Sequence, residues 1–234
     1  MTDFQPARKA IVAIDGPAGA GKSTIARHLA RHFGLLNLET GAMYRAFALK
    51  ALRAGLPLDE SSGLEGIASE TAIRLEPGDE ENRVLLDGED VTSLIRSQSV
   101  TDAASRVSVF PAIRAWMVRL QQELGAGGGV VMEGRDIGTV VFPHAEIKIF
   151  LDAAPEVRGL RRFDQLGSAA GSAVTVQPEE VVRELHARDE RDRTRVDSPL
   201  KAASDAVHLD STHMTLEQAV EAAEAIVAAK LGQI

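Results

Sequence analysis

Eight residues near the amino end have the types and spacing of a phosphate-binding loop. The run Gly16-Pro17-Ala18-Gly19-Ala20-Gly21-Lys22-Ser23, followed by Thr24, matches the pattern G-x-x-x-x-G-K-[ST]. The glycines allow the backbone to wrap with successive N–H groups pointing at a phosphate. Lys22 can reach the β- and γ-phosphates as a point charge, and the Ser23 hydroxyl can bind Mg²⁺. The run therefore predicts a nucleoside triphosphate site over residues 16–24.

The residues on either side of this loop supply the context that the motif needs. Ala10–Asp15 is a short apolar run, which is typical of a buried parallel strand. After the loop, Ile25, Leu29 and Phe33 recur every four residues and form one face of a helix. The positive end of that helix would point at the phosphate. This context disfavours the alternative, a glycine-rich strand-to-helix turn without a ligand.

A phosphate-binding loop by itself does not separate small-molecule kinases from regulatory GTPases and motor ATPases. GTPases usually carry N-K-x-D for guanine, and this sequence has no such run. A motor ATPase would have an apolar strand that ends in adjacent acids. Here "VVMEGRD" places Arg135 between Glu133 and Asp136. That arginine indicates that the end of the strand faces a second anion.

Arginines stand at the ends of predicted elements, where a second anion could bind. Arg45 and Arg135 both lie at the carboxyl ends of predicted parallel strands, which is where such sheets bind ligands. For the other arginines the alternative is a role in surface solubility, or salt bridges along one helix for the run "RDERDR". These others are Arg114, Arg158, Arg161, Arg162, Arg188, Arg191, Arg193 and Arg195. Phosphoryl transfer between two anions needs guanidinium groups to offset their repulsion, so the distribution favours that chemistry.

Apolar strands alternate with helices along most of the chain. Further strands are predicted at Leu35–Leu38, Val130–Glu133, Ile147–Ala153 and Ala206–Asp210, and helices at Ala42–Ala54, Pro111–Leu124, 155–167, 178–195 and Thr215–Leu231. The alternation predicts an α/β fold with a five-stranded parallel sheet flanked by helices. Strand patterns between Thr71 and Val91 predict a small antiparallel insertion. Residues 168–178, rich in small side chains, predict a mobile loop that could act as a lid.

Composition narrows the class of protein further. Of the 234 residues 44% are hydrophobic and only 4% aromatic, so the core must be aliphatic. The net charge of −8 argues against a nucleic-acid partner. The chain has no cysteine, which excludes disulfides and thiolate metal sites. The start of the sequence lacks the apolar core of a signal peptide, and no apolar run is long enough for a membrane. We expect a soluble cytoplasmic protein with small-molecule partners.

The motifs together resemble those of the bacterial cytidylate kinases, a family of nucleoside-monophosphate kinases. The matching runs cover nearly the whole chain and are "IDGPAGAGKST", "ETGAMYRA", "LLDGEDVTSLIRSQSVTDAASRVSVFPAIR", "EGRDIGTVVFPHAEIKIFLDA", "RDERDRTR" and "LDST". The resemblance implies one P-loop kinase domain over residues 1–234, with the loop at 16–24, an acceptor-binding insertion at about 40–115 and a lid at about 155–178. It also implies transfer of the ATP γ-phosphate to CMP or dCMP with Mg²⁺, by a monomer.

The resemblance assigns roles to single residues as well. Residues 16–24 would hold ATP, with Ser23 on Mg²⁺ and Glu133 reaching the ion through water. Arg45 and Arg135 would bind the acceptor phosphate, near Thr40. The other acceptor residues would be Ser105, Arg114 and Asp136 at the cytosine edge, Arg188 and Asp192 at the ribose, and Arg195 near the phosphates. Lys22, Arg135, Arg161 and Arg162 would stabilise the moving phosphoryl group.

This sequence departs from the family pattern at two positions. Glu133 stands where many members have Asp, and Ser23 stands where some have Gly. Two other hypotheses stay open at this point. A kinase of shikimate, dephospho-coenzyme A or another nucleotide would share the loop but lack the runs "SRVSVFPAIR" and "GRDIGTVVFP". A non-catalytic nucleotide-binding module would bind ATP without acceptor-dependent turnover, which the intact Lys22, Ser23 and arginine set disfavours.

Overall fold

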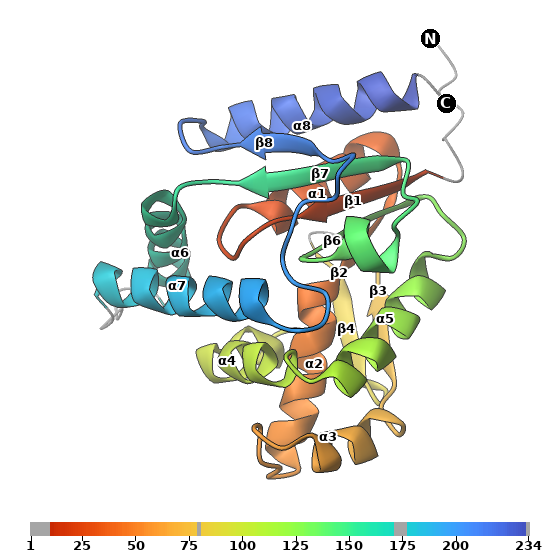
Figure 1. Ribbon diagram of the computed structural model, residues 1–234, viewed down its shortest axis with the longest axis vertical. Helices are drawn as coiled ribbons and strands as arrows, with labels where there is room; N and C mark the ends of the chain where they lie inside the picture. Colours follow the sequence, from red (N-terminus) through yellow and green to blue (C-terminus); the bar gives the residue numbers. More distant parts are fainter. Residues whose placement is uncertain (1–9, 79–80, 171–176, 233–234) are drawn as a thin grey trace.

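Five parallel strands form the central sheet, as the sequence predicts. The computed structural model describes residues 10–78, 81–170 and 177–232. The strands are β1 (Ile11–Asp15), β2 (Leu36–Glu39), β6 (Val130–Gly134), β7 (Ile147–Asp152) and β8 (Val207–Asp210). Their order is β2-β6-β1-β7-β8, and every neighbouring pair is parallel. All five carboxyl ends therefore meet at one edge, which faces the α6 and α7 region in Figure 1.

Helices cover both faces of this sheet because the strand side chains alternate in direction. The covering elements are α1 (Lys22–Phe33), α5 (Pro111–Gly125), the π-helical turn η2 (Ile137–Val141) and α8 (Leu216–Leu231). Val12 and Ile14 pack under α1 and α8, whereas Ala13 packs with residues of η2 and α5 on the other face. These strand residues are fully buried. The rigid core fixes the positions of the loops at the carboxyl edge.

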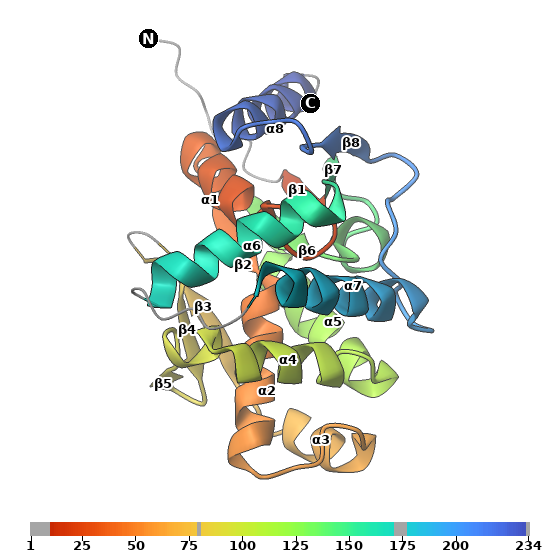
Figure 2. The same ribbon diagram turned by 90° about the vertical axis from the view of Figure 1, so that its left-hand side faces the viewer.

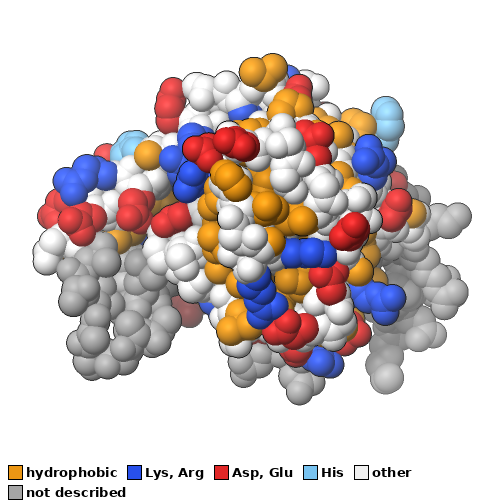
Figure 3. All heavy atoms as spheres, turned by 90° about the horizontal axis from the view of Figure 1, so that it is seen from below, with side chains coloured by type: hydrophobic (Ala, Val, Ile, Leu, Met, Phe, Trp, Pro, Cys, Tyr) orange, Lys and Arg blue, Asp and Glu red, His pale blue; other side chains and the backbone are white. Residues whose placement is uncertain are grey.

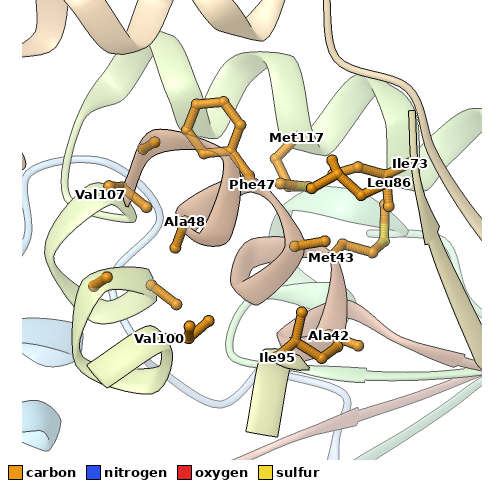
Figure 4. Close-up of a cluster of buried hydrophobic side chains, with 14 of the residues drawn as sticks. Ala42, Met43, Phe47, Ala48, Ile73, Leu86, Ile95, Val100, Val107 and Met117 are labelled. Atoms are coloured by element: carbon orange, nitrogen blue, oxygen red, sulfur yellow. The ribbon is translucent and has the colours of Figure 1, made fainter. Parts of the chain in front are cut away.

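The expected insertion forms a separate small sheet with its own helices. Its elements are α2 (Thr40–Arg53), α3 (Ser61–Ala68), β3 (Ile73–Glu76), β4 (Arg83–Leu86), β5 (Glu89–Asp90), η1 (Leu94–Arg96) and α4 (Gln98–Val107). The three strands are antiparallel, in the order β3-β4-β5. Phe47 of α2 and Met117 of α5 lie in the buried cluster that joins this unit to the rest of the molecule (Figure 4). Seen from below, this end of the molecule mixes hydrophobic and charged side chains on its surface (Figure 3).

Two long helices complete the carboxyl edge. They are α6 (Pro155–Ala170) and α7 (Pro178–Thr194), which pack against each other (Figure 2). Helix α6 continues through Ser168, Ala169 and Ala170, where the sequence predicts a loop. Two of these three are alanine, the residue with the highest helix propensity, so this extension has a simple cause. Residues 171–176 of the expected lid lie outside the described residues.

Other element boundaries also differ from the sequence-based expectation. Strand β2 is displaced by one residue, and α2 begins at Thr40 rather than at Ala42. The insertion was expected to combine strands and helices, but the sequence analysis gave no residue ranges for α3 and α4. The start of α4 is capped by the Ser97 hydroxyl, which accepts from the Val100 N–H at 3.4 Å. Helix α8 begins, as expected, near Thr215, where Thr215 and Gln218 form a capping box. Across the described residues, every helix is too short or too polar to cross a membrane.

Candidate active site

The loop between β1 and α1 has the backbone conformation that a phosphate cradle requires. Gly16, Gly19 and Gly21 have φ angles of 152°, 76° and 94°, which L side chains rarely adopt. A Cβ atom at Gly16 would lie 1.9 Å from the carbonyl oxygen of Leu151 on β7, so only glycine fits there. No side chain caps the start of α1. The first N–H groups of that helix therefore face the loop and are available to an anion.

Lys22 and Ser23 lie where the motif predicts them. The Lys22 Nζ donates to the carbonyl oxygen of Pro17 at 2.7 Å, which folds the ammonium back over the loop. Burial first and the charge of Arg135 second lower the pKa of Lys22 from 10.5 to about 7, while Glu133 opposes the shift. The Ser23 hydroxyl donates to Glu133 Oε1 at 3.0 Å. Both side chains thus point at one small region beside the carboxyl end of β6.

Asp15 holds the turn that follows β6. Its two carboxylate oxygens accept from the N–H groups of Ile137 and Gly138 at 2.8 and 2.7 Å. Burial raises the pKa of Asp15 to about 6, against the opposing effect of these two hydrogen bonds. Asp15 ends the strand that leads into the phosphate loop, so it ties that loop to the turn that carries Arg135 and Asp136. The sequence analysis did not assign it a role.

Arg135, Asp192 and Arg195 form a buried charge network on the acceptor side. Arg135 Nε donates to Asp192 Oδ2 at 2.8 Å, and Arg195 Nη1 lies 3.5 Å from Asp192 Oδ1. Burial alone would raise the pKa of Asp192, but Arg135, Arg188 and Arg195 together lower it below its ordinary value. Arg195 Nη2 is buried and has no hydrogen-bond partner among the described residues. The network therefore keeps donor capacity for another group.

Arg188 stands out because cations surround it. It is only partly exposed, and within the described part of the chain no hydrogen bond or ion pair satisfies its guanidinium. Burial together with the charges of Arg135, Arg45 and Arg162 lowers its pKa to about 10, while Asp192 opposes the shift. These guanidinium groups repel one another, and a bound anion would offset that repulsion.

Arg114 and Asp136 make an ion pair beside this cluster. Arg114 Nη2 donates to Asp136 Oδ2 at 2.5 Å and Nη1 donates to the Ser108 carbonyl oxygen at 3.2 Å. Both side chains are buried. The Arg114 guanidinium lies 5.9 Å from the centre of the Tyr44 ring, and burial raises the pKa of Tyr44 to about 12. Arg114 Nε and the Tyr44 hydroxyl are buried without a hydrogen-bond partner in the described structure, so their hydrogen-bonding capacity is unused.

The remaining residues predicted to bind the acceptor border the same region from α2 and α4. Thr40 at the start of α2 donates through Oγ1 to the Glu133 carbonyl oxygen at 2.8 Å. Arg45, one turn later, donates to Glu39 Oε1 at 2.6 Å, and its Nε has no partner among the described residues. The buried Ser105 hydroxyl accepts from Arg191 Nε at 3.2 Å. These contacts bring α2, α4 and α7 to the carboxyl edge of the main sheet.

An open cleft lies between α4 and the pair of helices α6 and α7. It has a volume of about 260 Å³ and is lined by residues that include Asp102, Arg106, Arg162, Arg188 and Arg191. A cleft of this charge and size, next to the arginine cluster, can admit part of a small anionic molecule. The structure thus brings the glycine-rich loop and a cleft lined by arginines to one edge of the sheet.

The comparisons with known proteins agree with this geometry. The sequence model of the cytidylate kinase family matches residues 12–229. A cytidylate kinase from Pelotomaculum thermopropionicum is 51% identical over 219 residues, which cover 93% of this chain and 96% of that protein. One from Pasteurella multocida is 42% identical over 212 residues, covering 91% and 92%. The chain belongs to the cytidylate kinase family.

Membership in the cytidylate kinase family makes this chain an enzyme, a nucleotide-binding phosphotransferase. Among solved structures, the chain resembles a shikimate kinase from Acinetobacter baumannii with a TM-score of 0.44 and 17% identity, over 96% of this chain and 94% of that one. A likeness at that level carries no argument about the acceptor.

In this member of the cytidylate kinase family, the two arginines predicted for the lid point in different directions. Arg162 lines the cleft. The pKa of Arg162 is lowered mainly by burial and then by the charge of Arg45. Arg161 instead donates to the Ser211 hydroxyl at 3.0 Å and to the Ser211 carbonyl oxygen at 2.8 Å. The structure therefore brings Arg162 together with the acceptor residues and places Arg161 against the segment between β8 and α8.

A buried ion pair that the sequence analysis did not foresee supports the loop of this cytidylate kinase family member. Arg158 is 2% exposed and donates to Asp189 Oδ2 at 2.6 Å. The same Nη1 donates to the carbonyl oxygen of Ala18 at 2.9 Å, while Asp189 Oδ1 accepts from the Ala18 N–H at 3.2 Å. Arg158 was grouped with the lid arginines, but here it holds the loop. No local pattern distinguishes it from Arg161 or Arg162.

Proposed function

We propose that the chain transfers the γ-phosphate of ATP to CMP or dCMP and releases ADP with CDP or dCDP. Family membership supports this reaction, and one observation on the structure carries it. The half-buried Arg188 lies among Arg45, Arg135 and Arg162 without an anionic partner of its own, beside the loop that holds Lys22. A second phosphate-bearing molecule placed there would offset the repulsion and face the first.

On the donor side, the loop and Lys22 would bind the triphosphate. The backbone N–H groups of residues 16–24 would surround the phosphates, and Lys22 Nζ would leave the Pro17 carbonyl oxygen for the β- and γ-oxygens. A buried ammonium whose pKa is about 7 regains its full charge when a polyphosphate lies beside it. Lys22 therefore stabilises charge that builds up on the transferred group, at a site with few competing water molecules.

On the acceptor side, arginines would align the monophosphate. Arg45 and Arg135 would bind its phosphate, Arg188 would lie beside them toward the ribose, and Arg162 would help to stabilise the moving phosphoryl group. Arg161 would have to leave Ser211 to join them. No side chain has to act as a nucleophile, because the acceptor phosphate oxygen is already anionic. Catalysis is then mostly alignment and charge stabilisation. Asp192 would hold these arginines in place through the 2.8 Å contact with Arg135, and would meet the ribose.

Mg²⁺ fits the oxygen atoms beside Lys22. The Ser23 hydroxyl would bind the ion directly, and Glu133, 3.0 Å away, would bind it through water. Hydroxyl, carboxylate and water oxygens are the ligands that Mg²⁺ prefers. When bound, the ion would neutralise part of the charge on the β- and γ-phosphates. Glu133 has one more methylene than the Asp of many members, which is compatible with contact through a water molecule.

The reaction is tested by supplying ATP and Mg²⁺ with CMP, dCMP, UMP, AMP or shikimate and measuring ADP release. We expect turnover with CMP and dCMP to exceed that with the other acceptors by at least about tenfold in kcat/KM, which corresponds to about 1.4 kcal/mol. ATP binding without turnover on any acceptor would indicate a nucleotide-binding module instead. Turnover on shikimate or AMP alone would indicate a kinase of another acceptor.

Replacing Asp136 by Asn tests which residues read the base. Asp136 accepts from Arg114 in a buried pair and would accept from the cytosine amino group, a donor that uracil lacks. An amide can present either a donor or an acceptor, so the CMP/UMP ratio of kcat/KM should fall by about tenfold. Steady-state kinetics with both acceptors measures this ratio.

The control for that experiment is Asp192→Asn. Asp192 is buried and paired with arginines in the same way as Asp136, but it lies on the phosphate and ribose side of the cluster. This variant should lower kcat/KM for CMP and UMP by the same factor. An unchanged CMP/UMP ratio in the Asp136 variant would remove that residue from base recognition.

We also propose a division of labour within one domain over residues 1–234. The core would hold ATP, residues of about 40–115 would bind the acceptor, and residues of about 155–178 would close over both. We further propose that the enzyme is a cytoplasmic monomer that acts on free nucleotides and not on nucleic acid. Light scattering of the purified protein measures its oligomeric state, and a dimer would contradict this part of the proposal.

A further inference from the structure

Two histidines and a glutamate meet at the solvent edge between α1 and α8. His28 and His32 are four residues apart on α1, so they share one side of the helix. Glu224 on α8 reaches both: its Oε1 lies 3.0 Å from His32 Nδ1 and also contacts His28 Nε2. One ligand atom from each of the three side chains lies within 4.8 Å of the others. Figure 2 shows α1 and α8 next to each other at this end of the molecule.

The backbone beneath this group is held firmly. Ile25 and Leu29 of α1 pack against Ala219, Ala223 and Val227 of α8 in one buried cluster. Three fully buried residues lie next to these polar side chains. Leu29 follows His28, Ala223 precedes Glu224, and Val227 lies one turn after Glu224. The two helices therefore cannot separate without opening the core. The three side chains can adjust by rotation while their backbone positions stay fixed.

The three ligand atoms are those of a transition-metal site. Two imidazole nitrogens and one carboxylate oxygen are a common Zn²⁺ donor set, with bonds of about 2.0–2.2 Å. Tetrahedral geometry at those bond lengths places ligand atoms about 3.3 Å apart. The present separations need only small side-chain rotations to reach that value. The side chains of His28 and His32 are 43% and 53% exposed, which leaves the fourth position open to water.

We propose that His28, His32 and Glu224 bind a divalent transition-metal ion, with Zn²⁺ the preferred one, and that this ion clips α8 to α1. The site is separate from the Mg²⁺ position proposed at Ser23, because His28 lies five residues further along the helix, a rise of about 7.5 Å. The consequence is mechanical. The metal cross-links the last helix of the fold to the helix whose first residue is Lys22, and so stabilises the element that carries the phosphate loop.

The experiment titrates Zn²⁺ into the nucleotide-free full chain, after removal of any polyhistidine tag, and follows binding by calorimetry. His28→Gln, His32→Gln and Glu224→Gln each remove one ligand, and His144→Gln is the matched control because that exposed histidine lies outside the group. We expect micromolar binding with one ion per chain in the parent and the control. Affinity should fall at least about tenfold in each of the three ligand variants.

Two further readouts separate a metal site from a simple ion pair. Excess Zn²⁺ should raise the Tm of the parent and the control by about 3 °C or more and leave the His28 variant unchanged. Bound Co²⁺ should give the intense visible absorption of a tetrahedral site only where all three ligands are present. Melting curves without metal show whether each variant folds. Equal Zn²⁺ affinity in all five proteins, or no shift in the parent, would overturn the proposal. None of these measurements involves ATP or CMP, so the outcome is independent of the proposed reaction.

Discussion

Replacing Lys22 by alanine will lower kcat by at least about 10²-fold to 10³-fold, the effect of removing one preorganised donor from a transition state. The reason lies in its surroundings. Lys22 is buried, folded over the loop at 2.7 Å from the Pro17 carbonyl oxygen, and no other lysine belongs to the motif. Single-turnover kinetics with CMP measures the chemical step directly. A parental rate in this variant would refute the role of Lys22.

The lowered pKa of Lys22 gives a second test of the same residue. The free protein at about pH 8 holds Lys22 largely neutral, since its pKa is about 7. A bound polyphosphate raises that pKa again, so ATP binding should take up a fraction of a proton. Calorimetry in two buffers of different ionisation enthalpy measures the uptake. At the same pH, the Lys22→Ala variant should take up fewer protons on binding ATP than the parent does. The Arg162→Lys variant keeps Lys22 and should take up as many protons as the parent.

The same shift affects stability with a definite sign. Between about pH 7 and pH 10.5, the unfolded chain binds a proton at Lys22 that the folded chain does not. The free energy of unfolding therefore gains a contribution from Lys22 that rises with pH across this window. Below about pH 7 the residue is charged in both states and the dependence ends. Urea unfolding of the parent and the alanine variant at several pH values isolates this contribution.

The parts of the site that the sequence predicts are those encoded in contiguous runs. The loop at residues 16–24 has a fixed spacing of glycines, lysine and serine, and the structure forms it between a buried strand and a helix. Arg135 and Arg45 could be placed because the carboxyl ends of parallel strands share one edge. The alternation of apolar runs and helices was sufficient to predict the parallel sheet, because helices cover both faces of each central strand.

The parts that the sequence does not predict depend on contacts between distant residues. Arg158 and Arg161 are three residues apart and chemically identical, yet one holds the loop and the other contacts Ser211. Their roles are decided by where α6 packs, and no local pattern contains that information. Helix α4 was missed because its buried positions include small residues such as Ala103 and Ala104, whose apolar signal is weak.

Arg158→Met should destabilise the folded protein by about 3–5 kcal/mol, because it leaves Asp189 as an unpaired charge in the interior. Arg158 and Asp189 are only 2% and 4% exposed in their side chains. The control is Arg183→Met on α7, the helix that carries Asp189; it removes an exposed pair with Glu180 at 3.8 Å and should cost less than about 1 kcal/mol. Urea unfolding of both variants measures the difference. A loss below about 1 kcal/mol for the Arg158 variant would contradict this prediction.

The double variant Arg158→Met with Asp189→Leu separates stability from loop anchoring. Removing both charges takes away the unpaired carboxylate, so much of the lost stability should return. Both polar groups of Ala18 still lose their partners, since its N–H and carbonyl oxygen are bound by this pair alone among the described side chains. The phosphate loop should therefore remain poorly ordered, and ATP should bind at least about tenfold more weakly than to the parent. Titration of ATP onto the double variant gives that affinity. Recovery of parental affinity along with stability would show that the ion pair supports the fold without shaping the loop.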